Sequence, residues 1–208
     1  MNEFSHFWLL AFSSFFTLIN PLGVMPVFLS LTAELTARER VQVATKSIIV
    51  AFLVILFFAL TGQFIFRFFN ISIHSLRVVG SFIFFMIGMD MLQARVARVE
   101  VKDAEIKRKY MRDISITPMA IPILCGPGAI TNAIILMEDA VNYRQQLSLF
   151  LAVVAVMAIT YLGLLGSSRI LQFIGETLNT VLMRLMGLII MVIAVEYFFA
   201  GVKPLLAR

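Results

Sequence analysis

Long apolar runs that carry no charge recur along the whole chain, and they leave few folds open to it. The run from Ile48 to Phe58 is one example, and the charged residues gather between such runs rather than within them. A helix that crosses a bilayer needs about 20 mostly apolar residues. The chain is 61% hydrophobic and only 14% charged, whereas a soluble domain is about a quarter charged. We therefore expect an integral membrane protein in contact with the lipid bilayer.

Six stretches are long and apolar enough to cross a membrane: residues 6–31, 47–68, 73–93, 115–138, 147–167 and 180–201. Helices are expected because an open strand edge in lipid would leave backbone polar groups unsatisfied. A β-barrel would show alternating patterns instead of continuous apolar runs. The predicted fold class is thus an all-α integral membrane protein with six transmembrane helices.

The basic residues predict how these spans are oriented. With six spans, both termini lie on the same side of the membrane as the second and fourth loops. Of the 17 Lys and Arg residues, 5 fall on that side and 12 on the other. Cytoplasmic loops carry an excess of Lys and Arg, so both termini are predicted to be extracytoplasmic and residues 94–114 to form a cytoplasmic linker. The same bias accounts for the net charge of +5, and no nucleic-acid partner is expected.

The chain divides into two halves, residues 1–93 and 115–208, with three predicted spans each. An odd number of spans per half forces the halves into opposite orientations, as in inverted-repeat transporters. Three matches about 106 residues apart support this division: Pro21 with Pro127, Arg38 with Arg144, and Arg77-x-x-Gly80 with Arg184-x-x-Gly187. Gly80 and Gly187 are expected to permit close helix contact.

Spans one and four each contain a helix-breaking motif near the middle, Asn20-Pro21-Leu22-Gly23 and Gly126-Pro127-Gly128. Proline cannot donate a helical hydrogen bond but is favoured at the first position of a helix, and Asn is a strong N-cap. Each motif therefore predicts a new helix that begins inside the membrane. In inverted halves the two N-termini would meet at a central region, where their free N–H groups suit a carboxylate. The alternative is a pair of kinks that only bend the spans.

The candidate substrate-binding residues lie at and beside these breaks: Thr17, Asn20, Pro21, Gly23, Gly126, Pro127, Gly128, Thr131 and Asn132. Asp90 and Glu196, within spans three and six, could carry a coupling proton or hold an ammonium group. Alternatively, each lies near a span end in contact with headgroup water. No catalytic group, metal or cofactor is expected, since the chain has one cysteine and two histidines that are far apart in sequence.

At these motifs the sequence resembles the MarC family (UPF0056-type integral membrane proteins, which include SnatA-like transporters). The resemblance covers essentially the whole chain, and it also rests on Pro26, Arg77-x-x-Gly80 and Arg184-Leu185-Met186-Gly187-Leu188. Ser81 stands where a second Gly would be expected, a departure that bears on helix packing. The resemblance implies transport of small neutral amino acids for some members, and a place in the cytoplasmic (inner) membrane of a bacterium or archaeon.

The function predicted is secondary transport of small solutes by alternating access around the half-helix termini at mid-bilayer. The chain has no G-x-x-x-x-G-K-[ST] motif that would indicate ATP-driven transport, and no enzymatic activity is expected. A channel or a non-transporting membrane assembly factor is the alternative. An intramembrane enzyme is less favoured, since no His lies in mid-span and no Ser-His or Asp-Asp constellation is present. The exact solute, the direction of transport, the coupling ion and the oligomeric state are left open.

Overall fold

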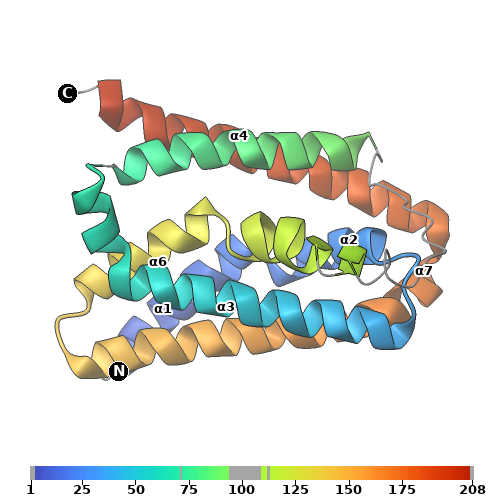
Figure 1. The fold of residues 1–208 in the computed structure, drawn as a ribbon, viewed down its shortest axis with the longest axis horizontal. Helices are drawn as coiled ribbons and strands as arrows, with labels where there is room; N and C mark the ends of the chain where they lie inside the picture. The colour runs from blue at the N-terminus through green and yellow to red at the C-terminus, as the bar shows by residue number, and fades with distance from the viewer. Residues whose placement is uncertain (1–2, 71, 94–108, 112, 207–208) are drawn as a thin grey trace.

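The computed structural model describes residues 3–70, 72–93, 109–111 and 113–206, and the regular structure within them is helical. The helices run back and forth along the long axis of the molecule (Figure 1). As a result, the start of the first helix and the end of the last lie at the same end of the molecule (Figure 1). The predicted all-α fold is confirmed.

The first crossing is made of two helices in succession, α1 (Glu3–Ile19) and α2 (Pro21–Leu31). Asn20 separates them and has left-handed backbone angles of φ 48° and ψ 69°. Pro21 occupies the first position of α2, as the Asn-Pro motif predicts. Because the backbone leaves helical geometry only at this one residue, the two helices form one broken span from Phe4 to Leu31.

The next two helices are α3 (Ala37–Phe68) and α4 (Ile73–Leu92). Helix α3 begins ten residues before the predicted span at residue 47, because Thr36 and Glu39 form a capping box. The Thr36 N–H donates to the Glu39 carboxylate at 2.8 Å, and the Glu39 N–H donates to the Thr36 hydroxyl at 3.4 Å. Helix α4 starts after the N-cap Ser72 and agrees closely with the prediction of 73–93.

The fourth crossing is also broken, into η1 (Ser115–Leu124) and α6 (Pro127–Asp139), and the span bends by 57° at this break. The segment η1 is not one regular helix. Thr117 and Ile121 within it have extended angles of φ −128° and ψ 121°. Each precedes a proline, whose ring disfavours helical geometry in the residue before it. The second predicted break, at Gly126-Pro127, is confirmed, because α6 begins at Pro127 after the N-cap Gly126.

Helix α7 (Tyr143–Leu206) covers both remaining crossings. The sequence predicts two spans joined by a loop between residues 167 and 180. The prediction of a loop is wrong, because the backbone of this connection is helical. Figure 1 shows α7 turning back at the right-hand end of the molecule, so it still crosses twice. Its two apolar parts, which we call α7a (Tyr143–Ser167) and α7b (Gly187–Leu206), are each long enough to span a membrane.

Each half of the chain packs its broken crossing against the second helix of the other half. The Ser148 hydroxyl in α7a donates to the Phe4 carbonyl in α1 at 3.1 Å. In the reciprocal contact, a Cβ placed on Gly62 of α3 would lie 2.5 Å from Ile134 Cγ1 in α6. Such reciprocity is what an inverted repeat requires. The boundaries of the halves stay a prediction, since residues 94–108 and 112 of the predicted linker lie outside the described residues.

The third helices of the two halves, α4 and α7b, lie side by side (Figure 1). Gly187 permits their close approach, as predicted, because a Cβ there would lie 2.7 Å from the Gly88 carbonyl oxygen. Large apolar side chains also cover the outside of the molecule, with Phe64 73% and Met86 68% exposed. Exposing so apolar a surface to water is unfavourable, whereas contact with lipid is not. The chain is thus a multi-pass membrane protein.

Candidate functional site

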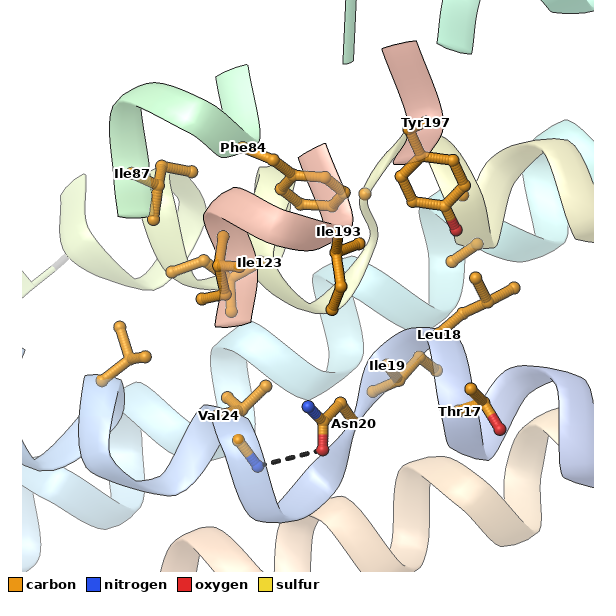
Figure 2. A pocket seen from close by; sticks show the side chains of 16 residues that line it. Thr17, Leu18, Ile19, Asn20, Val24, Phe84, Ile87, Ile123, Ile193 and Tyr197 are labelled. Atoms are coloured by element: carbon orange, nitrogen blue, oxygen red, sulfur yellow. Dashed lines mark hydrogen bonds between the residues drawn. The ribbon is translucent and has the colours of Figure 1, made fainter. Parts of the chain in front are cut away.

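A cavity of about 220 Å³ lies where the two helix breaks meet. Helices α2 and α6 both begin at this cavity and run toward opposite ends of the molecule (Figure 1). The rest of its wall comes from the end of α1, the end of η1, α4 and α7b. The residues that line the cavity are Thr17, Leu18, Ile19, Asn20, Gly23, Val24, Val27, Phe84, Ile87, Ile123, Gly126, Gly128, Ala129, Ile190, Ile193 and Tyr197 (Figure 2). The inverted arrangement of the halves predicts this meeting of the two breaks.

The N-terminus of α2 is capped by its own chain. The Gly23 N–H donates to Asn20 Oδ1 at 3.2 Å (Figure 2), and the Val24 N–H donates to the Asn20 carbonyl at 3.1 Å. Asn tolerates left-handed backbone angles better than most residues, so Asn20 can both turn the chain and cap the helix. At this break, therefore, the N–H groups of the cavity-lining residues Gly23 and Val24 already donate hydrogen bonds to Asn20.

The N-terminus of α6 is not capped in this way. Its N-cap is Gly126, which has no side chain to offer, and the first N–H with a backbone acceptor is that of Ile130, which donates to the Gly126 carbonyl at 3.0 Å. Among the described residues, the N–H groups of Gly128 and Ala129 have no acceptor. Both residues line the cavity. The α6 N-terminus therefore offers two free donors and the positive end of a helix dipole.

Two aromatic rings lie against the first turn of α6, and the glycines of the second break make room for them. A Cβ on Gly126 would lie 2.5 Å from Phe84 Cζ. A Cβ on Gly128 would overlap the Tyr197 hydroxyl oxygen and lie 2.8 Å from its Cζ. The requirement for Gly at these positions is thus a close approach of side chains to backbone.

Pro21 and Pro127 do not line the cavity, although both were predicted to bind substrate. Both are buried first residues of their helices. The Pro127 ring fills the space above Gly80, where a Cβ would overlap two of its ring atoms. This contact explains the Gly of Arg77-x-x-Gly80 and holds α4 against the start of α6. The two prolines therefore shape the backbone of the site from outside it.

The predicted polar side chains near the breaks differ in what they can offer a ligand. The Thr17 hydroxyl lines the cavity but donates to the Ser13 carbonyl at 2.8 Å. Thr131 Oγ1 and Asn132 Nδ2 are buried without a hydrogen-bond partner among the described residues. Neither residue lines the cavity. Of the side chains in the prediction, only those of Thr17 and Asn20 therefore reach it.

The acidic residues of spans three and six are not part of this cavity. Asp90 and Glu196 are both exposed on the outer surface of the helix pair, and neither lines the cavity. Tyr197 follows Glu196 directly but turns inward, because adjacent residues on a helix point about 100° apart. A coupling role for the two acidic residues stays a prediction.

Sequence reasoning missed the cavity wall opposite the breaks. Phe84 and Tyr197, together with Ile87, Ile190 and Ile193, come from α4 and α7b. Figure 2 shows Phe84 and Tyr197 on the far side of the cavity from Asn20, with Ile193 between them. Tyr197 carried one signal that could have been used, since a hydroxyl in an apolar span tends to face polar surroundings. Phe84 carried no comparable signal, because it is one of 20 phenylalanines in the chain.

The fold and the cavity together define the class: a multi-pass integral membrane protein with two broken helices. The chain matches the family model "MarC family integral membrane protein" over residues 4–206, and it belongs to the MarC family. A UPF0056 membrane protein of Methanocaldococcus jannaschii is 36% identical to it over 95% of this chain and 96% of the relative. One from Bacillus subtilis is 38% identical over 92% of both chains. No solved structure matches the chain.

Proposed function

We propose that this protein is a secondary transporter of small solutes, and that its solutes are small neutral amino acids. The observation that carries the proposal is the cavity in which the uncapped start of α6 faces the broken first span. Non-helical backbone is tolerated at membrane depth only where it is buried in protein or lines a cavity. Half-helix termini around such a cavity are the usual substrate site of inverted-repeat transporters.

The two broken helices offer complementary charges to a zwitterion. A solute carboxylate can accept from the free N–H groups of Gly128 and Ala129 at the positive end of α6. A solute ammonium group can donate to carbonyls in the last turn of α1, which is the negative end of that helix. Thr17, Leu18 and Ile19 lie in this turn and line the cavity. Pro21, having no N–H, leaves the Thr17 carbonyl without its helical donor.

The size and lining of the cavity favour a small and neutral side chain. Its volume of about 220 Å³ lies below the roughly 300–1,000 Å³ of pockets for drug-sized ligands. The rest of its wall is mostly aliphatic and aromatic, and none of its lining residues is charged. A charged side chain on the solute would lose its hydration there without gaining a partner. Transport of ions or of large drugs is therefore not favoured.

Reconstituted protein tests the proposal directly. Liposomes that contain the purified protein should take up labelled glycine or alanine with saturation, and an imposed proton gradient reveals whether transport is proton-coupled. Empty liposomes give the background rate. A channel would instead give flux that rises linearly with solute concentration and shows no counterflow. If none of a panel of neutral amino acids is moved or bound, the proposal is wrong.

We further infer that both termini are extracytoplasmic and that the protein resides in a bacterial or archaeal cytoplasmic membrane. Among the described residues, four basic residues flank the connections and the terminus at one end of the molecule: Arg67, Arg77, Arg144 and Lys203. Six lie at the other end: Arg38, Arg40, Lys46, Lys109, Arg169 and Arg184. The excess of basic residues marks the cytoplasmic side. Alkaline phosphatase fused to the C-terminus should be active, and a cytoplasmic reporter there should be silent; the reverse pattern would contradict the orientation.

A further inference from the structure

Two stacked aromatic rings form a wall over the free N-terminus of α6. Phe84 of α4 and Tyr197 of α7b have ring centroids 6.1 Å apart and planes inclined by 27°. Phe84 lies against Gly126, and Tyr197 lies against Gly128. The pair therefore brackets Pro127 and borders the cavity beside the two free N–H groups. Figure 2 shows the Tyr197 ring reaching toward Leu18 on the opposite side.

The rings are held in place by the packing of α4 against α7b. Gly88 and Gly187 bring the two helices into contact, because a Cβ on either would lie 2.7 Å from the carbonyl oxygen of the other. Further along, Phe82 and Phe198 meet edge to face with centroids 5.8 Å apart. Because the two helices are packed closely here, a large displacement of either ring also requires neighbouring side chains to shift.

The free space next to the α6 N-terminus is correspondingly small. A Cβ on Gly128 would overlap the Tyr197 hydroxyl and lie 3.1 Å from Leu18 Cδ2. A solute whose carboxylate binds the Gly128 and Ala129 N–H groups has these atoms within reach of its own side chain. Of the Tyr197 atoms, the hydroxyl oxygen lies nearest to a Cβ built on Gly128.

We propose that Tyr197, supported by Phe84, sets the upper size limit of the transported side chain and so determines which neutral amino acids the site accepts. This inference rests on the proposed function and adds a specificity-determining role to residues of the opposite wall. Size exclusion by a rigid wall discriminates more sharply than loss of a contact, because an oversized solute meets overlap rather than an empty space.

Competition measurements in liposomes test the inference. Uptake of labelled alanine by the wild-type protein is measured against unlabelled glycine, alanine, valine, leucine and phenylalanine, and competition should weaken as the side chain grows. In Tyr197→Ala, leucine should compete at least about tenfold more strongly relative to glycine, since one methylene more or less on a substrate in an apolar pocket is worth about 10- to 200-fold. Tyr197→Phe removes only the hydroxyl and should give a smaller shift in the same direction.

Phe199→Ala is the matched control, because Phe199 is an exposed ring two residues further along α7b and does not line the cavity. Its size series should equal that of the wild type. If Tyr197→Ala does not fold, Phe84→Leu provides the same readout from the other ring. An unchanged size series in a folded variant, or an equal loss for all competitors, overturns the inference and leaves the proposed function standing. A wild-type protein that moves no amino acid overturns both.

Discussion

Transport should fall about 5- to 140-fold when Gly128 is replaced with valine, because overlap in a packed site costs about 1–3 kcal/mol and, where this cost opposes solute binding, each 1.4 kcal/mol is a factor of ten in affinity. The added Cβ would overlap the Tyr197 hydroxyl and crowd Leu18. It would also cover the N–H groups to which a carboxylate is expected to bind. Initial uptake rates and solute affinity in liposomes measure the effect.

Gly166→Val is the matched control for this substitution, since a Cβ on Gly166 meets no atom within 4 Å. That variant should transport at close to the wild-type rate. A second test asks whether the overlap with Tyr197 is the cause. Gly128→Ala should impair transport in the wild-type background, and Tyr197→Ala in the same chain should restore part of it. Full activity of Gly128→Val would mean that the solute binds elsewhere.

Asn20→Ala should lower both stability and transport. It removes the cap of α2, worth about 1 kcal/mol, and forces alanine into left-handed backbone angles at a cost of about 1–2 kcal/mol. A loss of that size lowers the unfolding midpoint of a 150–250-residue protein by about 4–12 °C. Thermal unfolding in detergent measures the stability, and liposome uptake per folded molecule measures the transport. Asn20→Gly keeps the backbone angles and should cost only a few tenths of a kcal/mol.

Asn70 offers a comparison away from the cavity. It too has a left-handed backbone, with φ 51°, but it lies beyond the end of α3 and does not line the cavity. Asn70→Ala should therefore reduce stability through backbone strain while transport per folded molecule stays at the wild-type level. If Asn20→Ala behaves in the same way as Asn70→Ala, the first break bends the span without taking part in solute binding.

The features that the sequence determined by itself are those whose physics is local. An uncharged apolar run of about 20 residues predicts a span by itself, because its length and lack of charge match the hydrocarbon core of a bilayer. The sequence also predicted the two breaks, because a helix start depends on adjacent residues: Asn20 before Pro21, and Gly126 before Pro127. The meeting of the two breaks followed from the odd number of spans in each half, which orients the two halves oppositely.

Only the tertiary structure decided what surrounds the breaks. Phe84 and Tyr197 reach the cavity because α4 and α7b pack at Gly88 and Gly187, and contacts between such distant segments leave no pattern within either one. The difference between the two helix starts, by contrast, is local, because it depends on the side chain of the N-cap residue. Asn20 brings its own acceptor to α2, whereas Gly126 leaves α6 open. The sequence thus determined where the helices break, and packing determined which residues enclose the space between them.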